Sequence, residues 1–150
     1  MAALKKILAP TDFSELSAEG VRYALKLAKE VGAQAIVLNV VILDESNVVG
    51  KREMAAHEKR LSEFTSKLVG RRVGDLKIRE LVVSGQAYAA IVDCAEKERA
   101  DLIVMSTHGR SGLSRMLIGS VTDKLLRGAT CPVLVVPAGG KRAGFLGIAT

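Results

Sequence analysis

Apolar residues follow two different spacings along this chain. Short, nearly continuous apolar runs are typical of buried parallel strands, and stretches with an apolar residue every three or four positions are typical of amphipathic helices. The runs predict strands over residues 5–10, 35–43, 76–83, 101–105 and 131–137. The helical spacing predicts a first helix that ends at Gly32 and further helices over residues 51–73, 87–99 and 119–127.

Five strands and four helices in strict alternation predict an α/β fold. Right-handed crossovers would join them into a five-stranded, parallel, doubly wound sheet with helices on both faces. If the first and fourth strands are neighbours, a crevice forms where the strand order reverses, and Pro10, Thr11 and Asp12 lie opposite residues 105–110. The third strand partly alternates apolar and polar residues, which favours a place nearer the sheet edge.

The length of 150 residues predicts one domain, whose core is aliphatic because aromatic residues make up only 3% of the chain. We expect this domain to cover residues 1–137. Residues 138–150 contain several glycines and little periodicity, so we expect a flexible C-terminal tail there.

The net charge of +6 raises the question of nucleic-acid binding. The 22 basic and 16 acidic residues are interspersed, and the aromatic residues do not alternate with basic ones as a base-stacking surface requires. A solvated basic surface is the better interpretation, so we expect no nucleic-acid partner. No apolar run approaches the roughly 20 residues that span a membrane, and the amino terminus lacks a signal-peptide core. We therefore expect a cytoplasmic protein without membrane contact.

The few cysteines and histidines argue against a metal site built by the protein. Cys94 and Cys131 stand far apart without further ligands around them, so we interpret them as structural thiols. His57 falls on a predicted helix and His108 in a predicted loop, which leaves too few ligands in register for zinc. We expect His57 at the surface or at its boundary with the core.

The loop after the fourth predicted strand, residues 106–118, has the features of a phosphate site. Gly109 lets an anion approach the backbone, and the following helix, with Ser120 as its predicted cap, carries unpaired amides and partial positive charge at its start. Arg110 and Arg115 add positive charge. The alternative is an ordinary surface loop before a well-capped helix, and the spacing alone leaves both open.

Asp12 has two compatible interpretations. Either Asp12 or Ser14 can cap the first helix, and Asp12 with Glu15 has the spacing of a capping box. As a carboxylate at the end of the first strand, Asp12 is also placed to accept hydrogen bonds from a ligand's amino or hydroxyl group.

Several motifs in order resemble the universal stress protein family, the UspA-like domain, over residues 5–137. They are ILAPTDFS at 7–14, ADLIVM at 100–105, THGRSGL at 107–113, GSVT at 119–122 and CPVLVVP at 131–137. The resemblance implies a parallel α/β domain of adenine-nucleotide-binding type. It also implies a homodimer joined through the last strand, from Cys131 to Pro137.

The family's nucleotide-binding signature is glycine, two residues, glycine, nine residues, glycine, then serine or threonine. This chain keeps the spacing with Ser106, Gly109, Gly119 and Ser120, but serine replaces the first glycine. The extra hydroxymethyl group either obstructs ribose or phosphate, or is tolerated and donates a hydrogen bond. The sequence leaves both open.

The resemblance implies a set of nucleotide-binding residues, matched by position. Those around the base and ribose are Pro10, Thr11, Asp12 and Val40, with Met105 along the pocket wall. Those around the phosphates are Gly109, Arg110, Gly119, Ser120, Val121 and Thr122. Ser106 and His108 belong to the same segment, where His108 either orients the loop or touches the ligand.

The predicted function is an ATP- or adenine-nucleotide-binding module for regulation or stress response. Magnesium or manganese would arrive with the phosphates, and no residue is expected to be catalytic. No Walker-type lysine follows a glycine loop, so any ATP hydrolysis should be slow and incidental.

The sequence leaves two other functions open. A dimeric interaction protein of the same fold that has lost nucleotide affinity is the main alternative, and Ser106 motivates it. A phospho-acceptor receiver that uses Asp12 is weaker, because the end of the first strand carries a single acidic residue.

Overall fold

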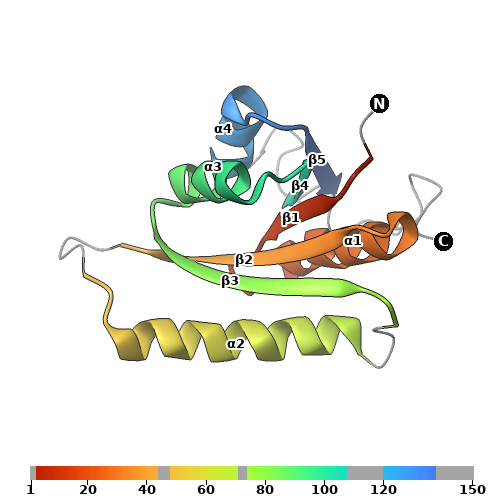
Figure 1. Cartoon of the computed structure of the whole chain (residues 1–150). Helices are drawn as coiled ribbons and strands as arrows, with labels where there is room; N and C mark the ends of the chain where they lie inside the picture. Colours follow the sequence, from red (N-terminus) through yellow and green to blue (C-terminus); the bar gives the residue numbers. More distant parts are fainter. Residues whose placement is uncertain (1–2, 44–47, 71–73, 108–119, 138–150) are drawn as a thin grey trace.

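The computed structural model describes residues 3–43, 48–70, 74–107 and 120–137. Over these ranges five strands and four helices alternate, as the apolar spacing predicts (Figure 1). The strands are β1 (Lys6–Pro10), β2 (Gln34–Ile42), β3 (Lys77–Gly85), β4 (Leu102–Thr107) and β5 (Val133–Pro137). The helices are α1 (Glu15–Val31), α2 (Lys51–Val69), α3 (Ala87–Glu98) and α4 (Ser120–Gly128).

All neighbouring strands of the sheet are parallel, and their order is β3-β2-β1-β4-β5. The first and fourth strands are neighbours, with Ile7 opposite Leu102, so the condition on which the expected crevice depends is met. The predicted edge position of β3 is confirmed too. The chain therefore turns to one side of β1 for β2 and β3, and to the other side for β4 and β5. The switch point lies between the carboxyl ends of β1 and β4.

Successive side chains of each strand point to opposite faces, and each face has its own core. Ile7 of β1 packs with α1 and α2 in one cluster, together with Val21 and Leu61. Leu8 packs with α3 and α4 in the other, together with Ile91 and Leu125. Helices thus cover both faces of the sheet, α2 on one side and α3 and α4 on the other (Figure 1). The doubly wound fold that the sequence predicts is confirmed.

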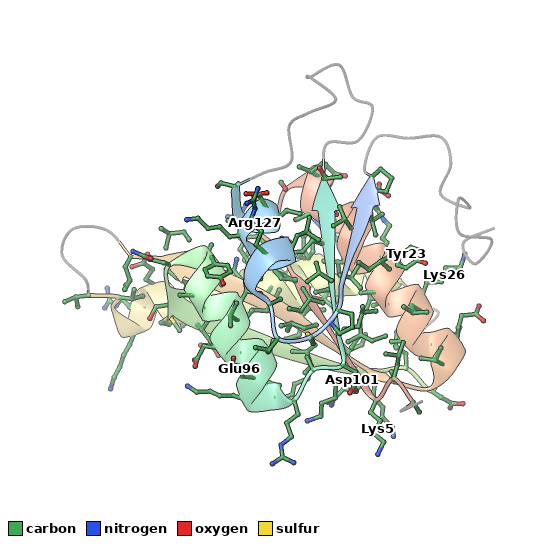
Figure 2. All side chains as sticks on the ribbon, turned by 90° about the horizontal axis from the view of Figure 1, so that it is seen from above. Lys5, Tyr23, Lys26, Glu96, Asp101 and Arg127 are labelled. Atoms are coloured by element: carbon green, nitrogen blue, oxygen red, sulfur yellow. The ribbon has the colours of Figure 1, made fainter. Side chains whose placement is uncertain are left out.

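The amino ends of β1 and β4 are joined by one side chain. Asp101 Oδ2 accepts hydrogen bonds from the backbone amides of Lys5, at 2.8 Å, and Lys6, at 3.0 Å. Figure 2 shows Asp101 and Lys5 beside each other at this end of the sheet. These bonds tie the start of β1 to the residue that precedes β4.

Helix ends agree with the sequence at α1 and differ at α2. Gly32 ends α1 in the left-handed conformation, with φ of 74°. Of the two candidate caps, Ser14 is the one used, and its side chain accepts from the Ser17 amide. The expected helix over 51–73 ends earlier, at Val69, because Gly70 adopts a φ of 61° that a right-handed helix does not allow.

The expectation that the fourth strand ends at Met105 is wrong. β4 continues through Ser106 and Thr107, which pair with Val136 and Pro137 of β5. The polar side chains break the apolar pattern, but the ladder with β5 continues past the point where the pairing with β1 ends. Ser106 is consequently a strand residue.

Three predicted segments lie outside the described residues: the loop over 108–119, the tail at 138–150, and residues 71–73 at the expected end of the second helix. Within the described ranges, no helix has the length and apolar character needed to cross a membrane.

Candidate functional site

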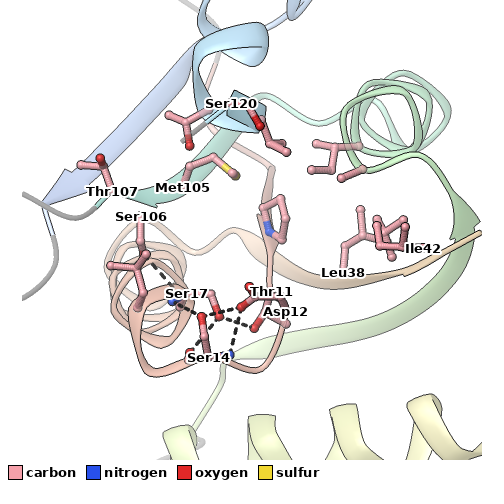
Figure 3. A pocket seen from close by; sticks show the side chains of 17 residues that line it. Thr11, Asp12, Ser14, Ser17, Leu38, Ile42, Met105, Ser106, Thr107 and Ser120 are labelled. Atoms are coloured by element: carbon pink, nitrogen blue, oxygen red, sulfur yellow. Dashed lines mark hydrogen bonds between the residues drawn. The ribbon is translucent and has the colours of Figure 1, made fainter. Parts of the chain in front are cut away.

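A cavity of about 410 Å³ opens at the carboxyl ends of β1 and β4, at the switch point of the sheet (Figure 3). Four predicted site residues, His108, Gly109, Arg110 and Gly119, lie outside the described residues. Every other predicted site residue lines the cavity. These are Pro10, Thr11, Asp12, Val40, Met105, Ser106, Ser120, Val121 and Thr122.

The sequence interpretation missed part of the lining. Leu38 and Ile42 of β2 flank Val40 at a spacing of two, so strand alternation alone could have found them. Ala87 and Ile91 of α3 complete the apolar wall, and only the packing of α3 on the sheet brings them there. The remaining lining residues that were missed are Ser14, Leu16, Ser17 and Thr107.

The loop between β1 and α1 is held by hydroxyl groups whose proton directions can be assigned. The Ser17 hydroxyl donates to the Ser14 carbonyl, at 2.9 Å. It must therefore accept from the Thr11 hydroxyl, 2.7 Å away. The Ser14 hydroxyl donates to Asp12 Oδ1, at 2.5 Å, and accepts from the Ser17 amide, at 3.1 Å. Each hydroxyl proton of this loop is thus used inside the loop (Figure 3).

Asp12 does not cap α1 but is a carboxylate held at the rim of the cavity. Its Oδ1 accepts from both the amide and the hydroxyl of Ser14. Partial burial opposes its ionisation, but hydrogen bonds, those from Ser14 foremost, outweigh that effect and lower the pKa of Asp12 below its ordinary value. The group is therefore ionised at neutral pH and can accept hydrogen bonds.

Ser106 directs its hydroxyl group at α1. The hydroxyl oxygen accepts from the Gly20 amide, at 2.5 Å, and lies 3.5 Å from the Ser17 carbonyl. A Cβ on residue 20 would lie only 2.5 Å from Ser106 Oγ, so glycine leaves the space that the serine fills. Figure 3 shows Ser106 beside α1. The serine that departs from the family signature is therefore matched by a glycine on the neighbouring helix.

The start of α4 forms the wall of the cavity across from Asp12. Ser120 is the first residue of α4, and Ser120, Val121 and Thr122 all line the cavity. The first amides of a helix have no partner within the helix, and they carry its partial positive charge. This wall consequently offers amides and two hydroxyl groups to an anion.

Thiols and metal ligands contribute little to the described part of the site. Cys94 is buried, and burial together with nearby Glu98 raises its pKa to about 11. Neither Cys94 nor Cys131 lines the cavity. Across the described ranges, no three acidic, histidine or cysteine side chains gather as a metal site.

These features define an α/β domain of the doubly wound parallel class, with a ligand cavity at its topological switch point. The chain belongs to the universal stress protein family, whose family model matches residues 3–137.

Two relatives from Methanocaldococcus jannaschii support this assignment. Universal stress protein MJ0531 is 39% identical over an alignment of 140 positions, and the match covers 88% of this chain and 81% of the relative. Universal stress protein MJ0577 is 31% identical over an alignment of 155 positions, and the match covers 88% of this chain and 94% of the relative.

Solved structures show the same fold. That of MJ0577 has a TM-score of 0.65 and 33% identity, and the match covers 93% of this chain and all of that one. A universal stress protein in complex with cAMP has a TM-score of 0.71 at 23% identity, and the match covers 90% of this chain and 98% of that one. The universal stress protein from Archaeoglobus fulgidus in complex with dAMP has a TM-score of 0.65 at 22% identity, and the match covers 91% of this chain and 99% of that one.

Proposed function

We propose that the switch-point cavity binds an adenine nucleotide, ATP included, and that the domain acts as a nucleotide-dependent module in regulation or stress response. One observation carries the proposal. The described residues implied by the family resemblance come from β1, β2, β4, α4 and the loop after β1, yet all of them line one cavity. Its volume of about 410 Å³ is in the range of small-molecule sites. The solved family members in complex with cAMP and dAMP support the choice of adenine.

The two sides of the cavity suit the two ends of a nucleotide. The base would lie on the apolar wall formed by Val40, Ile91 and Met105. The ionised Asp12 would accept a hydrogen bond from a ribose hydroxyl or an exocyclic amino group.

The phosphates would lie at the amino terminus of α4, against the first amides and the hydroxyls of Ser120 and Thr122. The roles of Gly109, Arg110, Gly119 and His108 stay predictions. Magnesium or manganese would enter with the phosphates, because Asp12 is the one acidic side chain that lines the described part of the cavity. We assign no catalytic residue, and any hydrolysis of ATP would be slow.

We further propose that the protein is a cytoplasmic homodimer joined through β5. β5 lies at one edge of the sheet, so its outer backbone groups are available to a second copy. Sedimentation at several protein concentrations measures the mass, and a monomer at every concentration would contradict the dimer.

The alternative, an interaction protein without nucleotide affinity, depends on obstruction by Ser106. Because α1 holds the Ser106 hydroxyl through the Gly20 amide, we expect Ser106→Gly to change ATP affinity by less than threefold. A gain of tenfold or more would show that the serine obstructs the site.

The experiment that tests the proposal measures thermal unfolding with ATP and magnesium, AMP, cAMP and GTP, after nucleotide that co-purifies has been removed. ATP at 100 times its dissociation constant should stabilise the fold by about 2.7 kcal/mol. For a domain of this size, that raises the midpoint by roughly 5–10 °C.

A matched pair of variants locates the binding. Ala87 lines the cavity and Ala89, on the same helix, is exposed. Ala87→Phe should reduce ATP affinity at least tenfold, because the ring fills the cavity, whereas Ala89→Phe should leave it unchanged. No midpoint shift with any nucleotide, or equal effects of the two variants, would refute the proposed site.

A further inference from the structure

A hydrogen-bonded polar pair, the buried Asn39 and the half-buried His57, lies on the opposite face of the sheet from the cavity. Asn39 of β2 is only 3% exposed and interrupts an apolar strand. Its Nδ2 donates to the Thr11 carbonyl, at 2.9 Å, and its Oδ1 lies 2.9 Å from His57 Nδ1 of α2. A carbonyl can only accept, so the amide nitrogen must face Thr11 and the amide oxygen must face His57. His57 Nδ1 therefore carries a proton and donates it to Asn39.

The Thr11 backbone is thus held from two sides. Its amide donates to the Leu38 carbonyl, at 2.8 Å, and its carbonyl accepts from Asn39. A buried amide side chain is costly unless its hydrogen bonds are made. Without the His57 donor, Asn39 Oδ1 would lose a partner in the core, and the amide would no longer be fixed toward Thr11.

Helix α2 also contacts Phe13, two residues after Thr11 in the same loop. Phe13 has a φ of 71°, in the left-handed region that a bulky residue seldom adopts. Its ring lies 6.0 Å from the His57 ring and 5.7 Å from the Phe64 ring, and the Arg60 guanidinium lies 4.4 Å above it. These α2 contacts hold Phe13 in a conformation that the isolated loop would leave.

We propose that His57 and Asn39 are positioning residues for the nucleotide cavity. They hold the loop from Thr11 to Ser14 from the face of the sheet opposite the cavity. In this way they orient the Asp12 carboxylate toward the ligand, although neither residue contacts the ligand. Neither residue lines the cavity, whereas Thr11, Asp12 and Ser14 do. The inference rests on the proposed nucleotide binding. It extends the site to α2, which packs on the face away from α3 and α4 (Figure 1).

Two substitutions separate the two contacts that His57 makes. His57→Phe keeps a ring beside Phe13 but has no N–H group for Asn39. His57→Gln keeps a donor but has no ring. Glu58→Gln, at an exposed neighbouring position, is the matched control. For each variant we would measure the ATP dissociation constant, the unfolding midpoint, and the hydrogen exchange of the Phe13 and Ser14 amides in the ligand-free protein.

We expect His57→Phe to weaken ATP binding about five- to tenfold, the factor that corresponds to the net contribution of one intramolecular hydrogen bond. The exchange of the Phe13 and Ser14 amides should accelerate by a similar factor. His57→Gln should recover most of the affinity, and Glu58→Gln should change neither quantity. A lower midpoint with unchanged affinity and unchanged loop exchange would overturn the proposal, because it would indicate a merely structural role.

The exchange measurement and one further experiment separate failure of this proposal from failure of the proposed function. If the wild-type protein binds no adenine nucleotide, the proposed function fails, and the exchange of the loop amides in ligand-free His57→Phe still decides whether His57 holds the loop. In the wild-type protein, coupling between sites is reciprocal, so ATP should shift the imidazole NMR signals of His57. Saturation with ATP that leaves those signals unmoved would overturn the coupling.

Discussion

Gly20→Ala tests the contact between α1 and β4 that accommodates Ser106. An alanine Cβ at position 20 would lie 2.5 Å from Ser106 Oγ, 3.1 Å from the Ser106 nitrogen and 3.2 Å from the Met105 carbonyl carbon. The serine side chain can rotate away, but it then gives up its hydrogen bond from the residue 20 amide. The two backbone contacts remain tight whatever the serine does.

The expected loss of stability follows from three opposing effects. Overpacking costs about 1–3 kcal/mol, and the lost hydrogen bond costs about 0.5–1.5 kcal/mol. Alanine in place of glycine in a helix returns about 0.8–1.0 kcal/mol. The net destabilisation is about 2 kcal/mol, which lowers the unfolding midpoint by roughly 4–8 °C for a domain of this size. Elsewhere in a helix, the same substitution would be expected to stabilise.

A double-mutant cycle in denaturant attributes this loss to Ser106. Ser106→Gly alone should cost about 1–2 kcal/mol, since it removes the hydrogen bond and places glycine in a strand. In the double variant Gly20→Ala/Ser106→Gly, the contact between the new Cβ and Ser106 Oγ is absent. The loss of unfolding free energy should therefore be smaller than the sum of the two single losses by about 1–2 kcal/mol. Ser106→Ala is the control, because it keeps the Cβ and removes only the hydroxyl.

Two results would refute the reasoning. If Gly20→Ala leaves stability unchanged or raises it, the close approach of α1 to β4 is absent. If the cycle is additive within about 0.5 kcal/mol, residues 20 and 106 do not contact each other.

Three further predictions follow from local geometry. Because hydrogen bonds lower the pKa of Asp12, its stabilising effect is present above the ordinary value of 3.8 and is lost as pH falls through the lower pKa of the folded state. The midpoint difference between wild type and Asp12→Asn should therefore shrink in a pH titration below 3.8, and a constant difference would contradict it. A Cβ on Gly128 would collide with the Tyr88 hydroxyl, so Gly128→Ala should lower the denaturation midpoint. Adding Tyr88→Phe to that variant should restore part of the midpoint, and no restoration would count against the contact. Cys94 is buried with a pKa of about 11, so iodoacetamide at pH 8 should label it far more slowly than in urea, and mass spectrometry showing equal rates would refute this.

Local spacing in the sequence determined most of the elements and their class. The apolar runs and the three-and-four spacing of α1 are visible without tertiary information, because burial of one face or of both faces requires those repeats. Gly32 marked the end of α1 for a similar reason, since few other residues adopt a φ of 74° without strain. Alternation also predicted the edge position of β3. The motif resemblance named part of the cavity lining, from Pro10 to Thr122, but not the residues of α3 or Leu38 and Ile42 of β2.

Only the tertiary structure decided the features that depend on contacts between distant segments. Ser106 belongs to β4 because β5 continues the ladder there, and its hydroxyl is accommodated because Gly20, 86 residues away, lacks a side chain. Asn39 looks like an interruption of a strand until the Thr11 carbonyl and His57 are placed on either side of it. The local spacing of apolar and polar residues does not reveal such pairs, because each partner is compatible with its own helix or strand. The packing of helices on the sheet is what joins them.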